Sequence, residues 1–427
     1  MFELSRRRLL RQSMWTALAV PLGGLAPRAA AGSTQVGSKE SDAYQAAFKA
    51  MVAEDPNVRG FFEKGREFLY RPRQLLVADQ DLQQVLKRLQ ELHLGGDPAA
   101  RFAGVTQVHL ADVDIPKLVA NLRDPKSWPR QKPPAVQPHH VTVGHDNIMG
   151  NPEGPPLAAL PLAPPPLTNP PEGEGVLVGV CDTGIWDGAG AFHLDWLGGS
   201  YLPEADDVDP LYRAGQLLAL QGGHGTFVAG VLRQAAPGVE FDPEVALSPS
   251  GLGDEQRLVA ALDRLDSQVS IINLSLGYFT QDDMAPLPLV NKMAELEQRR
   301  TVVVASAGNS ATDRPCYPAA MPTVVAVAAV APGALAPAPY SNFGGWVDAC
   351  ADGLRTSTYV LGSLELLGLL SIKFGGYASW AGTSFAAPHV AGRLAAMMTA
   401  NRYSAVDARQ DLLSQPTWRN GYGVLVG

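Results

Sequence analysis

The stretch Val176-Leu177-Val178-Gly179-Val180-Cys181-Asp182-Thr183-Gly184 decides the fold class. Its first six residues form an almost unbroken apolar run, which is typical of a strand buried on both faces of a sheet. Similar runs follow at 271–276, 302–306 and 324–330, and helical patterns lie between them at 256–265 and 287–299. Buried strands that alternate with helices predict an α/β fold, in which helices cover both faces of a parallel sheet.

The composition narrows the class of protein. Of the 427 residues, 46% are hydrophobic and 18% are charged, so the chain can bury a large core and is not a disordered protein. Its net charge of −8, without a basic block, argues against nucleic acid as a partner. Three cysteines exclude a disulfide-dense scaffold, and no C-x-x-C pair suggests zinc. Beyond residue 31 no apolar run reaches about 18 residues, so we expect no membrane anchor, and we expect a monomer.

Residues 1–31 have the pattern of an export signal rather than of a folded element. Residues 5–11 read Ser-Arg-Arg-Arg-Leu-Leu-Arg, a mildly apolar stretch follows at 14–26, and alanines occupy 29–31. The paired arginines resemble the bacterial twin-arginine signal, and an ordinary secretory signal or a basic helix is the alternative. Removal of this segment takes away five arginines and one glutamate, so the net charge changes from −8 to −12. We expect the product to be secreted or otherwise extracytoplasmic.

Residues 41–146 have the pattern of a small α+β domain. Helices are predicted at 41–66, 82–94 and 115–122, and strands at 73–78, 105–110 and 136–143. The proline-rich segment 147–175 is predicted to be an extended linker, because proline has no N–H for helix or sheet hydrogen bonds. A docking motif for another protein is the alternative. Residues 176–427 then form the larger α/β domain.

Three motifs in the larger domain carry reactive side chains. Asp182 ends the first buried strand, His224 precedes an apolar helical run, and Ser384 lies at a turn into a helix. Strand ends and helix starts of this kind meet at one edge of an open α/β sheet. A serine hydroxyl needs a histidine base within reach, and the histidine needs an aspartate that fixes its tautomer, so the three predict nucleophilic acyl transfer. Asn309, which follows another buried strand, offers an amide to the oxyanion, and the N–H of Ser384 offers a second donor.

Each motif alone is a weak signal, whereas their order is specific. Residues 175–425 carry D-T-G after a strand, H-G-T before a helix, A-G-N after a strand and G-T-S-x-A-x-P before a helix. This set resembles the subtilisin-like serine proteases, or subtilases. The resemblance implies a subtilisin-like parallel sheet and a serine endopeptidase that cuts protein or peptide substrates through an acyl-enzyme. It also implies that Asp182 orients His224, that His224 is the general base and acid, that Ser384 is the nucleophile, and that Asn309 stabilises the oxyanion.

The resemblance further implies the two walls of a substrate cleft. Ser275, Leu276 and Gly277 look like the segment that pairs with an extended substrate backbone. Ser306, Ala307 and Gly308 look like the other wall, which lines the pocket for the residue before the scissile bond. For both segments the alternative is an ordinary core strand and turn.

The amino-terminal domain has an interpretation through the same resemblance. Many subtilases carry a propeptide that assists folding and blocks the cleft, so residues 41–146 are expected to act as an intramolecular inhibitor and the chain as a zymogen. The support is only the order of strands and helices. A permanent accessory domain is the alternative.

Several positions depart from the family pattern. Phe227 stands where a second histidine is common, as a packing residue, and Asp352 stands in Ala-Asp-Gly where Ala-Pro-Gly is usual. Residues 359–374 are predicted to be an inserted hairpin beside the cleft. No cofactor is expected to be required and no metal site is assigned, because the segment after the histidine helix is too short for the usual calcium loop. Calcium is considered at the acidic run 204–209, where a solvated loop is the favoured alternative.

The three cysteines have different expected roles. A disulfide between Cys316 and Cys350 is considered, because some secreted relatives have a bridged cysteine near the first position, although the partner position does not match. Cys181 lies on a buried strand beside Asp182 and is expected to be a small core residue rather than a nucleophile.

Two other functions are compatible with the motifs. A catalytically silent module that grips peptides would have lost a member of the triad, and none is lost here. An esterase or acyltransferase could use the same triad, but Ser384 lacks the G-x-S-x-G elbow of the α/β-hydrolases.

Overall fold

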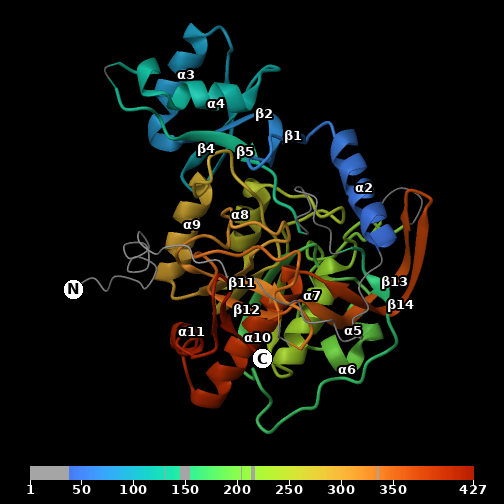
Figure 1. Cartoon of the computed structure of the whole chain (residues 1–427). Coiled ribbons are helices and arrows are strands. Elements are labelled where there is room, and N and C mark those ends of the chain that lie inside the picture. The colour runs from blue at the N-terminus through green and yellow to red at the C-terminus, as the bar shows by residue number, and fades with distance from the viewer. Residues whose placement is uncertain (1–37, 130, 145–153, 203, 213–216, 334–335) are drawn as a thin grey trace, which may run out of the picture.

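A computed structural model describes residues 38–129, 131–144, 154–202, 204–212, 217–333 and 336–427 (Figure 1). The export signal predicted for residues 1–31 lies outside the described residues. None of the described helices is long and apolar enough to cross a membrane.

An eight-stranded sheet forms the centre of the larger domain. Its strands, in spatial order, are β15 (Trp418–Arg419), β16 (Gly423–Leu425), β12 (Ala349–Asp352), β11 (Val324–Val330), β10 (Val302–Ser306), β9 (Ile271–Leu274), β7 (Leu177–Asp182) and β8 (Glu240–Val245). All neighbours pair in parallel except β15 and β16. The predicted parallel sheet is therefore confirmed.

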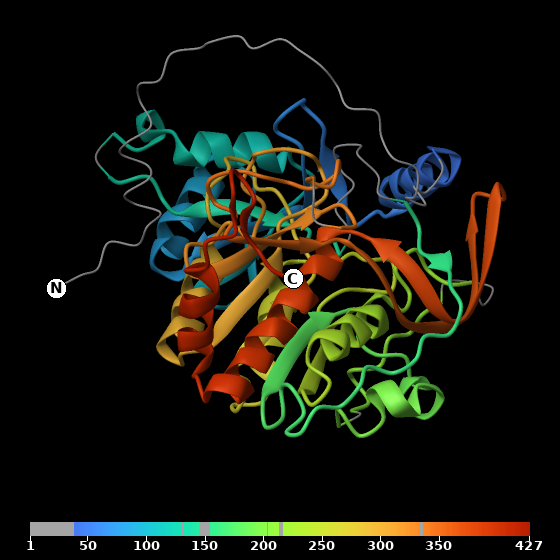
Figure 2. The same cartoon turned by 60° about the horizontal axis from the view of Figure 1, so that its bottom comes forward.

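Helices cover both faces of this sheet. Val302 and Val304 face a cluster that includes α7 (His224–Ala235) and α10 (Thr383–Asn401). The alternate residues Val303 and Ala305 face a second cluster, which includes α8 (Glu255–Arg264) and α9 (Leu287–Gln298). Side chains that alternate along a strand point to opposite faces, so both faces of β10 are apolar because both are covered. Figure 2 shows α10 in front of the strands.

The remaining helices of the larger domain are short or peripheral. They are α5 (Ala189–Phe192), α6 (Leu194–Leu197) and α11 (Ala405–Leu413). A long hairpin, β13 (Leu354–Leu366) and β14 (Leu370–Ala381), projects from the body, as Figures 1 and 2 show. The hairpin predicted at 359–374 is confirmed, and its strands extend further at both ends, from Leu354 to Ala381.

A five-stranded antiparallel sheet forms the core of the amino-terminal domain. The strands run β1 (Arg59–Phe61), β2 (Phe68–Ala78), β4 (Val105–His109) and β3 (Asp97–Phe102), with β5 (Val136–His140) also pairing with β2. The helices are α3 (Leu82–Glu91) and α4 (Ile115–Arg123), with short 3-10 turns at Asp79–Asp81 and Pro125–Ser127. The domain sits above α8 and α9 in Figure 1. The predicted α+β order is confirmed, with β1 and β3 as additional strands.

The first helix differs from its predicted bounds and place. The helix α2 runs from Ser38 to Glu54, whereas the sequence pattern predicted 41–66. Pro56 lies just beyond it, and proline cannot continue a helix. The apolar side chains of α2 share a core cluster with the larger domain and with Val58 and Leu69 of the amino-terminal segment, and they are absent from the cluster that includes α3 and α4. Residues 41–146 therefore contribute to two core clusters, one of which is shared with the larger domain.

The proline-rich segment is also more integrated than predicted. Its residues 145–153 lie outside the described part of the chain. From Gly154 onward the segment lies against the larger domain, where β6 (Leu157–Ala158) pairs antiparallel with β14. The segment predicted at 147–175 as an extended linker is extended at β6, where it also pairs with the larger domain.

The disulfide considered between Cys316 and Cys350 is not formed. Cys316 packs with Phe68 and Phe279, whereas Cys350 lies in β12 in a different buried cluster. Burial raises the pKa of the Cys350 thiol to about 11. Burial also raises the pKa of Cys181, which is fully buried, in agreement with its expected place in the core.

Candidate active site

Asp182 and His224 form a hydrogen-bonded pair at the edge of the central sheet. Asp182 is the last residue of β7, and His224 is the first residue of α7. Gly223, just before the helix, has φ +90, a conformation that favours glycine. The Asp182 Oδ1 to His224 Nδ1 distance is 2.7 Å, and both residues are buried. The carboxylate fixes the proton on Nδ1, so Nε2 is the nitrogen that can act as a base.

A second aspartate, which the sequence analysis did not identify, ties together the loops that carry Asp182 and His224. The Asp209 carboxylate accepts hydrogen bonds from Thr183 Oγ1 at 2.6 Å and from the Gly223 amide at 2.8 Å. These donors flank Asp182 and His224 in the chain. Burial raises the pKa of Asp209 to about 6, against the effect of its hydrogen bonds. Its only sequence signal was membership of the acidic run 204–209.

An aromatic wall surrounds the imidazole of His224. The ring centroids of Trp380 and Phe385 lie 5.3 Å and 5.4 Å from that of His224. Phe227 packs against Phe385 with a centroid distance of 4.6 Å. The expected packing role of Phe227 fits this position, and the wall keeps the Asp182–His224 pair away from water.

Ser384 faces a peptide segment of the same chain. It is the second residue of α10 and is 1% exposed. Its hydroxyl donates to the carbonyl oxygen of Gly144 at 3.1 Å and lies 3.4 Å from the carbonyl oxygen of Ser275. Phe385, the next residue, packs against the His224 ring, so the start of α10 lies beside the imidazole.

Thr383 orients the predicted oxyanion residue. Asn309 Oδ1 accepts hydrogen bonds from the amide and from the hydroxyl of Thr383, both at 2.9 Å. The Thr383 hydroxyl in turn accepts from the Gly308 amide at 3.0 Å. Because its oxygen is held by Thr383, Asn309 directs its NH₂ group elsewhere, as an oxyanion donor requires. The positioning role of Thr383 was not predicted.

Residues 142–144, which we call the tail, lie as a strand between two backbone walls. Val143 exchanges two hydrogen bonds with Gly277, at 3.0 and 2.8 Å. On the other side Thr142 exchanges two with Gly253, at 3.2 and 2.9 Å, and the Gly144 amide donates to Gly251 at 2.9 Å. The predicted wall at Gly277 thus binds an extended backbone, and the wall at 251–253 was missed.

The other predicted cleft residues have mixed positions. The Leu276 and Ala307 side chains are fully buried in apolar clusters, so they support the walls from behind. Ser275 donates its hydroxyl to the Ser384 carbonyl at 2.7 Å, and Ser306 is the buried last residue of β10. A Cβ on Gly277 would lie 2.7 Å from Cys316 Sγ, and one on Gly308 would lie 3.3 Å from it. Cys316 therefore lies behind the two predicted walls, at 275–277 and 306–308.

The chain returns to the active site after the tail. The carbonyl oxygen of Gly154 accepts a hydrogen bond from Trp380 Nε1 at 3.2 Å. Trp380 packs against His224, and the tail ends at Ser384. Gly144 and Gly154 thus lie near Ser384 and His224, respectively.

The acidic run contains a group of carboxylates. In the part of the chain that the structure describes, Glu204, Asp206 and Asp207 are the residues whose ligand atoms come together as a metal site would need. Glu204 and Asp206 are exposed. Burial raises the pKa of Asp207 to about 7, and the nearby carboxylates of Glu244 and Asp206 raise it further.

Comparisons with known proteins agree with this geometry. Residues 173–421 match the profile of the Subtilase family. The thermophilic serine proteinase of Bacillus sp. (strain AK1) is 32% identical over 248 residues, which are 56% of this chain and 55% of the relative. Subtilisin Savinase of Lederbergia lenta is 30% identical over 262 residues, which are 57% of this chain and 84% of that protein.

A solved structure extends the likeness to most of the fold. Fervidolysin from Fervidobacterium pennivorans, described as a keratinolytic enzyme related to subtilisin, superposes with a TM-score of 0.59 at 22% sequence identity. The match covers 86% of this chain and 61% of fervidolysin. The chain thus spans little more than half the length of the Bacillus proteinase and of fervidolysin.

Proposed function

The chain belongs to the subtilase family, and we propose that it is a serine endopeptidase, made as an exported precursor, that cuts peptide bonds through an acyl-enzyme on Ser384. The observation that carries this proposal is the tail. A peptide strand of this chain is held by backbone hydrogen bonds on both sides, and its Gly144 carbonyl accepts from the Ser384 hydroxyl at 3.1 Å. The cleft therefore has the shape and hydrogen-bonding groups that an extended peptide substrate needs.

The proposed chemistry follows from the arrangement of the polar groups. His224 removes the Ser384 proton as the hydroxyl attacks the scissile carbonyl, and Asp182 stabilises the imidazolium that forms. The NH₂ group of Asn309 and the Ser384 amide donate to the oxyanion. His224 then returns the proton to the leaving amine, and water hydrolyses the ester on Ser384.

The amino-terminal domain is proposed to be an intramolecular inhibitor. Its strand β5 leads directly into the tail, which occupies the cleft as a substrate would. Polar contacts fix the domain on α8: the Arg71 guanidinium meets Asp254 at 3.0 Å, and Gln137 donates to Glu255 at 2.8 Å. A permanent accessory domain would not need to place the tail that follows its last strand against Ser384.

The maturation cut is proposed to fall at a bond between Gly144 and Gly154. The tail before this segment pairs with the cleft walls, and Gly154 after it bonds to Trp380. Residues from Gly154 onward would stay with the enzyme, because β6 is part of the β13–β14 sheet. Export through the twin-arginine signal at residues 5–11 is proposed from the sequence.

The activity is tested with an organophosphonate serine probe and a protein substrate. The parent chain should give one adduct on Ser384, and Ser384→Ala should give none. Loss of the nucleophile should lower kcat by about 10⁶-fold. Labelling is repeated after a trace of external protease has cut within 145–153, so that a blocked cleft is distinguished from an inactive one. Equal hydrolysis by the parent and Ser384→Ala would overturn the proposal.

A further inference from the structure

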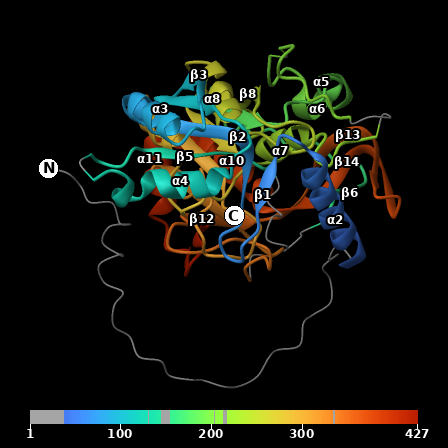
Figure 3. The same ribbon diagram turned by 90° about the horizontal axis from the view of Figure 1, so that it is seen from above.

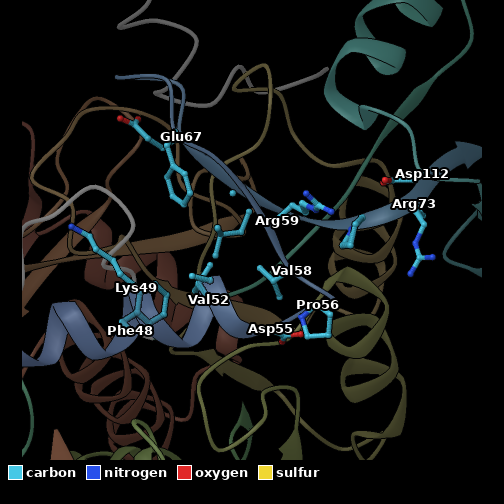
Figure 4. Close-up of a pocket in the computed structure, with 15 residues that line it drawn as sticks. Phe48, Lys49, Val52, Asp55, Pro56, Val58, Arg59, Glu67, Arg73 and Asp112 are labelled. Carbon is cyan, nitrogen blue, oxygen red and sulfur yellow. The ribbon is translucent and has the colours of Figure 1, made fainter. Parts of the chain in front are cut away.

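The helix α2 packs on the larger domain and also contacts β1 of the sheet that it precedes. Its buried side chains lie on one face and belong to the core cluster of the larger domain: Ala43, Tyr44, Ala47, Phe48 and Val52. None of them is in the core cluster of the five-stranded sheet. A cavity of about 1050 Å³ lies between α2 and the strands β1 and β2. Figure 4 shows Phe48 and Val52 of α2 on one side of this cavity and Arg59 on the other.

One face of the inserted hairpin, which α2 contacts at β13, is apolar. Along β14, Ile372 and Phe374 are buried while Ser371 and Lys373 are exposed, which is the alternation of a strand covered on one face. Leu364 of β13 lies directly opposite Ile372. These side chains share one buried cluster with α2, and α2 contacts β13. Figures 1 and 3 show α2 beside the hairpin.

This contact borders the catalytic centre. The Tyr44 hydroxyl donates to the carbonyl oxygen of Leu220 at 3.0 Å, in the loop that ends just before His224. The hairpin holds the same loop, because the Leu218 amide donates to Ser363 at 2.9 Å. Gln221, the residue after Leu220, lies beside the tail, since a Cβ on Gly144 would be 2.2 Å from its side-chain oxygen. A ligand in the place of α2 would therefore flank a substrate in the cleft.

We propose that this surface, the hairpin face (Leu218, Leu364, Leu366, Ile372 and Phe374), is an exosite that binds an amphipathic helix of protein substrates, and that α2 closes it in the precursor. The inference rests on the proposed function. If the amino-terminal segment leaves after the cut, the hairpin face is left as an apolar patch beside the cleft, and patches of this kind mark binding sites. Leu367 and Leu369 at the hairpin tip are already 52% and 76% exposed, and they extend the patch.

The helix that occupies the face defines the chemistry of the ligand. Tyr44, Phe48 and Val52 recur every four residues, so they form one stripe on a helix. The outer side of α2 carries exposed charged residues, including Lys39, Asp42 and Lys49. The exosite should accordingly prefer a helix with two aromatic residues and one aliphatic residue at this spacing.

Binding is tested in the full chain with Ser384→Ala, so that no cutting intervenes. A fluorescent peptide of residues 38–54 is added to this chain and to a version with Tyr44→Ala and Phe48→Ala, which loosens its own α2. The peptide should bind the loosened chain about 100-fold more tightly, because it restores two buried aromatic side chains. The matched control is a peptide with the same two alanines, which should not bind. Equal binding to both chains, or none to a loosened chain whose circular dichroism is native, would overturn the exosite.

A second measurement does not depend on the loosened variant. In the processed parent enzyme, the peptide should raise KM for a protein substrate that carries the 38–54 helix and leave hydrolysis of a short chromogenic peptide unchanged. Equal inhibition of both substrates would place the peptide in the cleft and contradict the proposal. Self-association of the loosened chain would identify a second copy as the occupant instead. Absence of hydrolysis of either substrate would refute the proposed function, while the binding result with Ser384→Ala would still decide on the exosite.

Discussion

The amino-terminal segment contacts the larger domain through two interfaces of opposite character. In the first, which we call the polar interface, β2 and β5 meet the start of α8 through six polar side chains: Arg71, Gln137, His139, His140, Asp254 and Glu255. In the second, the apolar interface, α2 lies on the hairpin face. Buried polar groups lose much stability when a partner is displaced, whereas apolar surfaces tolerate different occupants of similar volume. The polar interface therefore sets the register of the tail, and the apolar interface is suited to exchange of ligands.

The largest effect is expected where Glu255 is removed. Its side chain is fully buried and accepts hydrogen bonds from Gln137, from the His140 amide and from the Tyr278 hydroxyl. Glu255→Ala leaves these donors unpaired and should loosen the docked domain by about 3–5 kcal/mol. In the Ser384→Ala background, hydrogen exchange of the tail amides should accelerate by roughly 10²- to 10³-fold. Glu255→Gln keeps a hydrogen-bond acceptor and should weaken the docking much less. If the two variants weaken docking equally, the loss of these hydrogen bonds is not the cause.

A smaller effect is expected at the apolar interface. Phe48 is 5% exposed, and Phe48→Ala should weaken the docking of α2 by about 1.5–3 kcal/mol, because an aromatic side chain leaves an apolar contact. Hydrogen exchange should rise in α2 and stay unchanged in the tail. If tail exchange rises as much as in Glu255→Ala, the two interfaces act as one and the comparison fails.

The polar interface should respond to acid through His139. Burial lowers the pKa of His139 from its ordinary value, while Asp254 and Glu255 oppose the shift and Arg71 and His140 add to it. The docked state therefore favours neutral His139, so its contribution is complete above about pH 6.5 and is lost as pH falls from there toward the lowered pKa. Each unit by which docking lowers the His139 pKa corresponds to about 1.4 kcal/mol of docking free energy. The nearby Asp254 titrates in a more acidic range, because its own pKa is lowered below its ordinary value.

The check is tail exchange measured from pH 7.5 to 5 in the Ser384→Ala chain. Exchange corrected for its intrinsic pH dependence should accelerate on acidification, and His139→Gln should flatten the profile. A profile that is the same in His139→Gln would assign the acid response to another group.

The smallest effect is expected at Arg66, in the exposed loop between β1 and β2. Its guanidinium lies 3.7 Å from the Glu63 carboxylate, and both side chains are about 60% exposed. Arg66→Ala should change the stability of either interface by less than about 0.5 kcal/mol. A larger change, measured by urea unfolding, would show that the loop takes part in docking.

The local parts of this architecture could be predicted from the sequence. The apolar runs identified the buried strands, and short motifs identified Asp182, His224, Ser384 and Asn309. The helix at 41–66 was predicted too long, and β3 was missed, because Asp97–Phe102 has little apolar alternation. Both errors arise because a weak periodic pattern fixes neither the ends of a helix nor the presence of a short strand.

The long-range parts could not be predicted in the same way. Thr383, Asp209 and the wall at 251–253 act through contacts with residues far away in the chain. The apolar stripe of α2 indicates that something covers it, but a periodic pattern does not say which surface does. The disulfide considered for Cys316 and Cys350 was wrong for a related reason, since the spacing of cysteines does not place them in the same cluster.

The most direct test of the account is the intact mass of the purified chain from Gly32 onward, incubated alone and beside its Ser384→Ala variant. The account predicts that the parent alone acquires a new amino terminus within residues 145–154, because the tail that ends at Gly144 lies against Ser384. Cleavage at the same place in both chains, or a new terminus far from this segment, would contradict the central claim that the chain cuts the peptide held in its own cleft.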